Sequence, residues 1–277
     1  MLQAMLAGHP NIFTFPESHF FHKIRGRLGN WPIRSAVSPR AATRSLDALL
    51  ASVELETRPN VPRWWPGLGW YGRSFRAIVD EATQARGLDL WIDKSPIHLH
   101  YIEEIRQAIP GAKFVHLLRD GRDVVASLLE ASRREPDRWI PQLLPRAKGN
   151  PNRDRLIDAS TARWNEDLQR TLARLSDRDH YILVYEELLD MPQAALAALC
   201  DFLGVGFASS MIQHHDSARD VVGWRGDLPH MALVFHPLED RRLIRFQGLP
   251  EEEQMRIVAN LDHAGDPRAA LRAVQDG

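Results

Sequence analysis

The sequence predicts an α/β fold in which a parallel central sheet is flanked by helices in three layers. Four short apolar segments alternate with helical patterns at a spacing typical of β-α-β units. Proline and glycine close the helical stretches, as they do between the strands of a parallel sheet. The predicted strands are residues 11–15, 88–93, 113–118 and 180–186. We expect both crossover connections between them to be right-handed.

Two helices are predicted directly from the spacing of apolar residues. Pro110-Gly111 ends the first, whose apolar positions are Leu99, Ile102, Ile105 and Ile109. The second begins near Pro192 and ends at Gly204. The opening residues resemble the second half of an amphipathic helix that ends at Gly8 and Pro10.

Length and composition favour one large domain spanning residues 1–277. A chain of 277 residues with 44% hydrophobic content can bury a large core. Residues 25–87 interrupt the regular pattern and form a tryptophan-rich insertion. The insertion contains Trp64, Trp65 and Trp70. These side chains could line an acceptor pocket, or they could pack a long loop against the core.

Charge and cysteine content exclude several classes of protein. Thirty-five Lys plus Arg against thirty-six Asp plus Glu argue against general nucleic-acid binding. No apolar stretch approaches the roughly 18 to 20 residues that a membrane span requires. Cys200, the single cysteine, cannot form an internal disulfide and is expected to be a small buried residue. A cytoplasmic location is therefore expected.

The stretch KFVHLLRDGRDVVASLLE, residues 113–130, predicts a strand, a tight turn and a helix. Such a junction leaves backbone N–H groups unpaired at the start of the helix. Arg119 and Arg122 lie beside these groups, so the junction suits an anion. The sequence therefore predicts a local anion site here.

Several segments together resemble the sulfotransferases that use 3′-phosphoadenosine 5′-phosphosulfate (PAPS). The residues that carry the resemblance are HPNIFTFPESHFF, WIDKSPIHLHYIEEIRQAIPGAKFVHLLRDGRDVVASLL, RWNEDL and ILVYEELLDMPQAALAALCDFLGV. Their order and spacing are most similar to the bacterial branch that resembles tyrosylprotein sulfotransferases. The resemblance implies a P-loop-like α/β fold and transfer of a sulfuryl group from PAPS to an acceptor hydroxyl. The acceptor would be a small molecule, a carbohydrate or a peptide.

The resemblance implies that Arg119 and Ser127 hold the 3′-phosphate of the nucleotide. A guanidinium offers paired donors to a phosphate, and a hydroxyl on the facing helical turn supplies another. The alternative for Arg119 is a salt bridge to Asp120 or Asp123 at the strand end. Arg122 and Asp123 are interpreted as a charge pair that shapes the turn rather than as ligands.

Two further nucleotide contacts follow from the family pattern. Tyr185 is expected to end the fourth strand and to line the nucleotide site. The segment RRLIRFQGLPEEEQ resembles a degraded form of the family's G-R-W segment, which assigns Arg245 to the 3′-phosphate. Arg225, in VVGWRGDLP, is the competing candidate.

Lys94, Glu17 and His19 are the predicted catalytic residues. The resemblance implies that Lys94 stabilises charge on the transferring sulfuryl group or its leaving phosphate. It also places the general base at Glu17, whose pKa we expect to be raised because neighbouring phenylalanines partly desolvate it. His19 is the rival base, since other sulfotransferase branches use histidine.

The family's first strand and its P-R-S-G-T-T phosphosulfate loop are missing from the sequence. We therefore expect that the true start lies upstream of Met1, or that the chain is truncated with weak or no activity. The alternatives in other classes are a non-catalytic nucleotide- or partner-binding remnant and a P-loop kinase relative. No pattern suggests a metal site, and His214-His215 is interpreted as a surface helix end.

Overall fold

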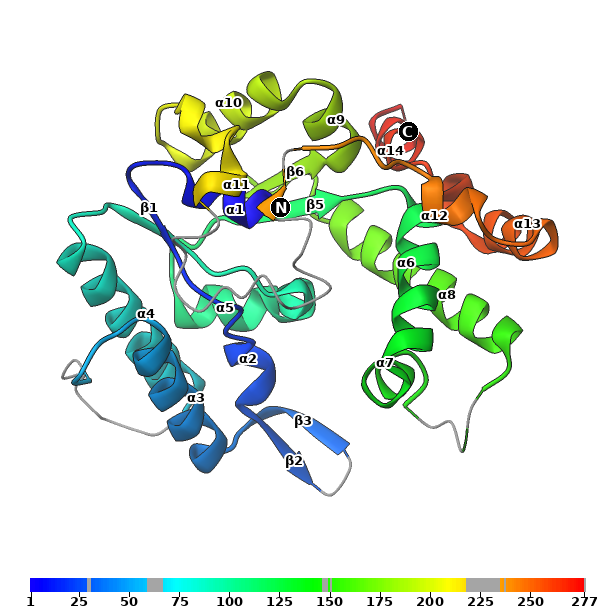
Figure 1. Cartoon of the computed structure of the whole chain (residues 1–277). Helices are drawn as coiled ribbons and strands as arrows, with labels where there is room; N and C mark the ends of the chain where they lie inside the picture. Colours follow the sequence, from blue (N-terminus) through cyan, green and yellow to red (C-terminus); the bar gives the residue numbers. More distant parts are fainter. Residues whose placement is uncertain are drawn as a thin grey trace. The chain divides into compact units, whose positions relative to one another are not determined.

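The computed structural model describes residues 1–28, 31–58, 67–145, 149, 151–217, 235–236 and 238–276. The chain divides into two compact units. Figure 1 shows the order of the helices and strands along the chain. Unit 1 comprises Met1–Lys113 and Leu196–Pro237, and unit 2 comprises Phe114–Ala195 and Leu238–Gly277. The prediction of a single domain over residues 1–277 stays a prediction.

Unit 1 contains a parallel pair of short strands, β1 (Ile12–Thr14) and β4 (Leu90–Ile92). Their register places Ile12 opposite Leu90 and Thr14 opposite Ile92. Both strands lie where the sequence predicted them. The expected opening helix is α1 (Leu2–Ala7), and Gly8 caps its C-terminal end.

The described part of the insertion at residues 25–87 forms regular elements that its sequence did not predict. It forms an antiparallel hairpin of β2 (Arg25–Leu28) and β3 (Trp31–Val37), followed by α3 (Pro39–Ser52) and α4 (Leu68–Ala85). Ser38 caps α3 by accepting a hydrogen bond from the Ala41 N–H at 3.3 Å. Trp64 and Trp65 lie outside the described residues, whereas Trp70 lies in α4 with its ring 4.8 Å from that of Tyr71.

The remaining elements of unit 1 are short. The helix predicted after the second strand begins as a 3₁₀ turn, η1 (Pro96–Tyr101), and continues as α5 (Ile102–Ala108). The second sequence segment of unit 1 contains η2 (Ser209–Met211) and α11 (His214–Ser217). The interpretation of His214-His215 as a surface helix end is wrong for His214, which is buried.

Aromatic side chains fill the core of unit 1. Phe20 packs against Phe75 of α4 with ring centroids 4.8 Å apart, and Phe15 lies 6.4 Å from the same ring. The short α2 (Phe20–Lys23) therefore attaches to α4 through Phe20. The helices α4 and α5 approach closely at Gly72, where an added Cβ would overlap the Cβ of Ala108.

We predict that Gly72→Ala lowers the free energy of unfolding by about 1 to 3 kcal/mol, because the new methyl group overpacks the α4–α5 contact. The matched control is Gly69→Ala in the same helix. At Gly69 the nearest atom to an added Cβ is a flexible Arg73 nitrogen at 3.4 Å. Since alanine favours a helix over glycine by roughly 1 kcal/mol, this control should be neutral or stabilising. Urea unfolding of both variants tests the contrast, and equal effects would contradict it.

Unit 2 contains the second parallel pair, β5 (Phe114–Leu118) and β6 (His180–Val184), with Phe114 opposite His180. All four predicted strands therefore exist, and they are described as two parallel pairs. β5 leads into α6 (Gly121–Arg134), as the sequence predicted, and α6 packs against α8 (Arg153–Leu172). The short α7 (Pro136–Leu143) lies between them in the chain.

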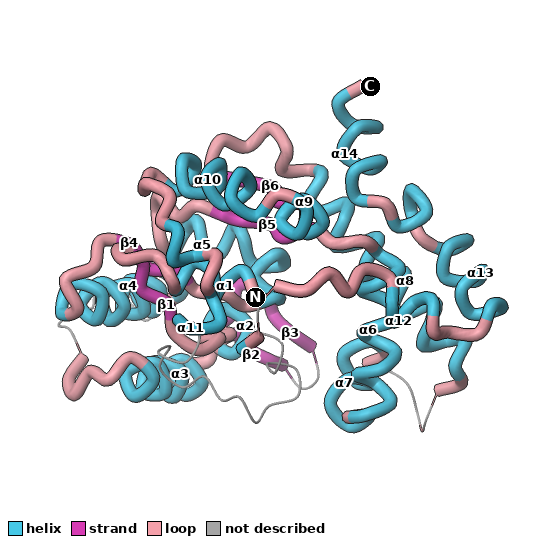
Figure 2. The backbone as a smooth tube through the Cα atoms, turned by 45° about the horizontal axis from the view of Figure 1, so that its top comes forward, coloured by secondary structure: helices cyan, strands magenta, loops and turns pink. Residues whose placement is uncertain are grey.

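Helices account for most of unit 2 (Figure 2). After β6 come α9 (Tyr185–Asp190) and α10 (Pro192–Leu203), which begins in unit 2 and ends in unit 1. Gly204 follows α10 with a φ of +88°, as expected of a helix-ending glycine. The last elements are α12 (Ile244–Gln247), α13 (Glu251–Asn260), η4 (Asp262–Gly265) and α14 (Pro267–Gln275).

A hydrophobic core packs much of unit 2. It joins β5 to α6, α8 and the C-terminal helices, and its buried members include Leu118, Val125, Leu129, Ile157, Trp164, Leu168, Phe246 and Ile257. Trp164 also donates a hydrogen bond from Nε1 to the carbonyl of Arg119 at 3.1 Å. This bond fixes the backbone at the point where β5 ends.

No helix in the part of the chain that the structure describes is long and apolar enough to cross a membrane. Cys200 is a free, buried cysteine on α10, as its sequence predicted.

Candidate active site

The three predicted catalytic side chains lie together at the carboxyl ends of β1 and β4 in unit 1. Glu17 and His19 come from the segment after β1, and Lys94 comes two residues after β4. Lys94 Nζ donates to Glu17 Oε1, and His19 Nε2 lies 3.0 Å from Glu17 Oε2. The carboxylate of Glu17 is thus held between the two basic side chains.

Asp93 and Ser95 connect the two segments that carry these residues. The hydroxyl of Ser18 donates to Asp93 Oδ2 at 2.5 Å, and the His19 N–H donates to Ser95 Oγ at 3.0 Å. The side chains of both Asp93 and Ser95 are buried. These bonds fix the segment after β1 against the segment after β4. Sequence reasoning missed this role, although both residues flank Lys94 in the quoted DKSP.

His19 adopts an unusual backbone conformation at this site. Its φ of +49° and ψ of +24° lie in the left-handed region, which residues other than glycine seldom occupy. Such conformations persist where surrounding contacts hold them, and they are common at functional sites. Here the bond from the His19 N–H to Ser95 supplies one such contact.

The pKa of Glu17 differs from the sequence-based expectation. Burial raises it, as expected, but the hydrogen bond from His19 and the charge and hydrogen bond of Lys94 outweigh burial and lower it from 4.5 to about 2. The expectation of a raised pKa is therefore wrong for this arrangement. Glu17 is a charged carboxylate at neutral pH, and it can accept a proton only weakly while both partners remain bound.

Arg119 of unit 2 directly follows β5. Of the two salt bridges considered for it, to Asp120 or to Asp123, it forms the one to Asp123. Its Nη2 donates to Asp123 Oδ2 at 3.1 Å. The guanidinium also lies over the ring of Tyr185, 4.7 Å from the ring centroid. Its Nε is buried and meets no acceptor among the described residues. Arg119 thus has one N–H group that the described residues leave without a hydrogen bond.

The predicted charge pair between Arg122 and Asp123 is not the one that forms. Arg122 pairs with Asp120 instead, through Nε to Oδ1 at 2.9 Å and Nη2 to Oδ2 at 2.5 Å. Asp120 also caps α6 by accepting from the Arg122 N–H at 2.9 Å. This leaves Asp123, one helical turn later, to bind Arg119.

Ser127 lies between two ion pairs on one face of α6. Asp123 and Glu130 are four residues before and three residues after it, a spacing that places all three on the same helix face. Arg119 pairs with Asp123, and Arg245 of α12 pairs with Glu130 through Nε at 2.7 Å. Arg119 and Arg245, two of the predicted phosphate ligands, therefore bind α6 on either side of Ser127, the third. Arg225, the competing candidate, lies outside the described residues.

The prediction that Tyr185 ends the fourth strand is wrong, because Tyr185 begins α9 directly after that strand. The strand stops at Val184 because the next residues turn into a helix. Burial raises the pKa of the Tyr185 phenol, and the nearby Arg119 lowers it in part. Tyr185 therefore presents a neutral hydroxyl and an aromatic face beside Arg119.

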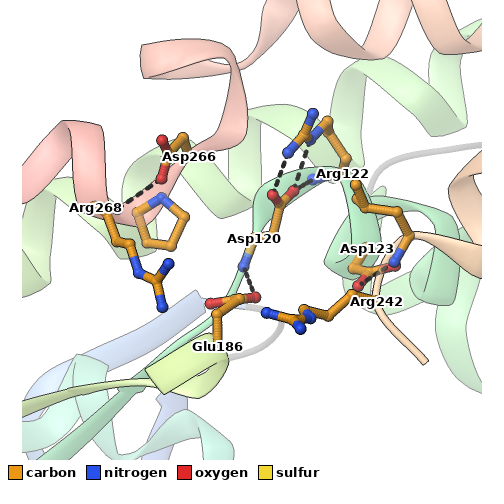
Figure 3. A pocket seen from close by; sticks show the side chains of 9 residues that line it. Asp120, Arg122, Asp123, Glu186, Arg242, Asp266 and Arg268 are labelled. Atoms are coloured by element: carbon orange, nitrogen blue, oxygen red, sulfur yellow. Dashed lines mark hydrogen bonds and ion pairs between the residues drawn. The ribbon is translucent and has the colours of Figure 1, made fainter. Parts of the chain in front are cut away.

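A cavity of about 230 Å³ lies beside the turn that follows β5 (Figure 3). Its lining residues come from the starts of α6, α9 and α14 and from the segment before α12, and are Asp120, Arg122, Asp123, Glu186, Arg242, Leu243, Asp266, Pro267 and Arg268. Among its charged lining residues, Asp120 and Arg122 pair with each other, whereas Arg242 and Arg268 both pair with Asp190, which is outside the lining. The buried Glu186 accepts a hydrogen bond from the Asp120 N–H at 3.0 Å, and burial raises the pKa of its carboxyl group.

Among the described residues, one group could hold a metal ion: Asp177, Asp179 and His180. His180 Nε2 lies 3.8 Å from a carboxylate oxygen of each aspartate. The group lies at the start of β6, whereas Tyr185 follows the end of that strand. It is therefore separate from the candidate nucleotide ligands, and the absence of a catalytic metal stays a prediction.

Comparison with known proteins identifies the family. The sequence model of the sulfotransferase family matches residues 1–209 of the 277. The chain belongs to the sulfotransferase family. A Caenorhabditis elegans protein named as a putative protein-tyrosine sulfotransferase is 26% identical over 132 residues, which cover 47% of this chain and 46% of that protein. A Caenorhabditis briggsae protein of the same name is 21% identical over 126 residues, which cover 45% of this chain and 40% of that protein.

Solved structures of sulfotransferase domains share the fold. The domain from the olefin synthase of Synechococcus PCC 7002 aligns with a TM-score of 0.53 and 20% identity, covering 94% of this chain and 87% of that one. The domain from the curacin biosynthetic pathway aligns at 0.50 and 21%, covering 93% and 91%. The predicted sulfotransferase fold is thus confirmed. The chain spans about half the length of the curated relatives that it matches.

Proposed function

We propose that this protein transfers a sulfuryl group from PAPS to the hydroxyl of a small molecule, a carbohydrate or a peptide. The acceptor oxygen attacks sulfur, and the bond between sulfur and the bridging phosphate oxygen breaks. A base takes the acceptor proton. The products are the sulfated acceptor and 3′-phosphoadenosine 5′-phosphate.

Arg119, Ser127 and Arg245 are the proposed ligands of the 3′-phosphate. Guanidinium groups give charge-assisted hydrogen bonds to phosphate oxygens, and the hydroxyl of Ser127 adds a neutral donor. The buried Nε of Arg119, with no acceptor among the described residues, supports this assignment. Tyr185 supplies an aromatic face beside Arg119 and is proposed to line the nucleotide site.

Lys94 and Glu17 are the proposed catalytic pair, with His19 as the alternative base. Sulfuryl transfer resembles phosphoryl transfer, in which fixed positive charge and positioning supply most of the catalysis. Lys94 would stabilise charge on the transferring group or its leaving phosphate. When Lys94 turns to that group it leaves Glu17, which removes one cause of the low pKa of Glu17 and makes the carboxylate a better base.

The observation that carries the proposal is the convergence of Glu17, His19 and Lys94 at the ends of two parallel strands. Ligands in open α/β sheets bind beyond these strand ends. The three residues are separated by up to 77 positions in the sequence, yet Glu17 contacts both of the others.

We expect the protein to bind 3′-phosphoadenosine 5′-phosphate at least tenfold more tightly than adenosine 5′-phosphate, because the extra phosphate gains charge-assisted hydrogen bonds. Isothermal titration calorimetry with the two nucleotides measures this preference. Adenosine 3′,5′-cyclic phosphate, in which one phosphate bridges the 3′ and 5′ oxygens, is the control for binding without two separate phosphate groups. Equal affinities for the first two nucleotides would contradict the proposed donor.

A second assay follows PAPS consumption with panels of phenols, sugars and tyrosine peptides. Sulfuryl transfer to one class would identify the acceptor. Nucleotide preference without any transfer would instead support a binding protein that has lost catalysis. A cytoplasmic location, expected from the single buried cysteine, also stays a proposal.

A further inference from the structure

Asp123 joins two parts of unit 2 that the proposed function uses. One oxygen of its carboxylate, Oδ2, accepts hydrogen bonds from Arg119 Nη2 at 3.1 Å and from the Leu243 N–H at 3.0 Å. Arg119 lies four residues before Asp123, whereas Leu243 lies 120 residues after it. The same atom therefore holds a strand end and a distant backbone segment.

Leu243 fixes the start of α12, the helix that carries Arg245. It is the N-cap of α12 and has a left-handed φ of +59°, a conformation that a leucine adopts only under constraint. The bond from its N–H to Asp123 supplies such a constraint. Two residues later, Arg245 reaches Glu130 on the same face of α6 as Asp123.

Asp123 is itself well fixed. Only 2% of the residue is exposed, and its carboxylate is compensated by two donors, one of them a guanidinium. A buried charge with paired donors is costly to move, because displacement would leave both the charge and its donors unsatisfied. Asp123 can therefore serve as a rigid anchor for the groups that it binds.

We propose that Asp123 is a positioning residue for recognition of the 3′-phosphate, an inference that rests on the proposed function. It directs the guanidinium of Arg119 and sets the start of α12, so that Arg119 and Arg245 are held on either side of Ser127. The phosphate binds N–H groups of Arg119 other than the one that Asp123 occupies. The carboxylate is thus retained when nucleotide binds.

If Asp123 competed with the phosphate instead of positioning its ligands, removing Asp123 would change the affinity for the 3′-phosphate in the opposite direction. If Asp123 only competed with phosphate for Arg119, its removal would free the guanidinium and remove a negative charge, and affinity for the 3′-phosphate would rise. If Asp123 positions the two arginines, its removal lowers that affinity. The direction of the change therefore separates the two roles.

The test compares Asp123→Ala with Asp120→Ala, which removes another buried, arginine-paired carboxylate from the same turn. Asp120 binds Arg122 and caps α6 but does not pair with Arg119. The measured quantity is the ratio of Kd values for adenosine 5′-phosphate and 3′-phosphoadenosine 5′-phosphate. We expect Asp123→Ala to reduce this ratio by roughly tenfold, and Asp120→Ala to lower thermal stability while keeping the ratio within about threefold of wild type.

Asp123→Asn keeps the proposal testable if the alanine variant does not fold. Its amide oxygen can still accept from Leu243, but the charge that holds Arg119 is lost, so the ratio should fall by about three- to tenfold. A ratio that is unchanged or raised in Asp123→Asn overturns the positioning role. A wild-type protein with no preference for the 3′-phosphorylated nucleotide overturns the proposed function, and this inference falls with it.

Discussion

Replacing Lys94 with alanine should lower kcat for sulfuryl transfer by about 10²-fold or more, because a fixed cation at the transferring group stabilises the transition state. Glu17→Gln should cause a loss of similar size, about 10²-fold, because the glutamine cannot take the acceptor proton. The measurement is steady-state PAPS consumption by the full-length protein with an identified acceptor. Affinity for 3′-phosphoadenosine 5′-phosphate should change much less than kcat in both variants.

Lys113→Ala is the matched control for Lys94. Lys113 also lies in unit 1, but its Nζ donates to the carbonyls of Phe202 and Leu203, away from Glu17. We expect it to keep near-normal turnover. If Lys94→Ala and Lys113→Ala lower kcat equally, Lys94 has no special role in the chemistry.

His19→Gln separates the two candidate bases. If Glu17 is the base, His19→Gln should lower kcat less than Glu17→Gln does, since His19 then only orients the carboxylate. A larger loss from His19→Gln would assign the base to His19. Full activity of Glu17→Gln would exclude Glu17 from proton transfer.

Arg119→Ala should weaken binding of 3′-phosphoadenosine 5′-phosphate by roughly 1.5 to 3 kcal/mol, because hydrogen bonds to a charged phosphate are lost. Binding of adenosine 5′-phosphate should barely change, since that nucleotide has no 3′-phosphate. Calorimetry with both nucleotides separates a specific loss from a general one. Equal losses for the two nucleotides, or none for either, would remove Arg119 from the 3′-phosphate site.

Arg122→Ala is the matched control for Arg119. Arg122 lies on the same turn, but its guanidinium is bound to Asp120 and lies 6.0 Å from the ring centroid of Phe246. We expect Arg122→Ala to leave the preference between the two nucleotides within about threefold of wild type. A loss equal to that of Arg119→Ala would show that the turn as a whole, rather than Arg119, recognises the phosphate.

Local patterns in the sequence were sufficient to place the strands and the turn that carry the candidate site. Each predicted strand is a short apolar segment bounded by polar or turn residues, and each is present. Because parallel strands expose their carboxyl ends at one edge, the residues after β1 and β4 could be expected to meet. The contact of Glu17 with Lys94 agrees with that expectation.

Tertiary structure alone decided which charged groups pair and how their pKa values shift. The sequence allowed either Arg119 or Arg122 to pair with Asp123, and in the folded chain Arg119 pairs with Asp123 while Arg122 pairs with Asp120. The low pKa of Glu17 required His19 and Lys94 to reach the same carboxylate from different segments. The link from Asp123 to Leu243 spans 120 residues, and no local pattern predicts it. Apolar periodicity is a local property of the chain, whereas ion pairs and desolvation depend on atoms that only the folded chain brings together.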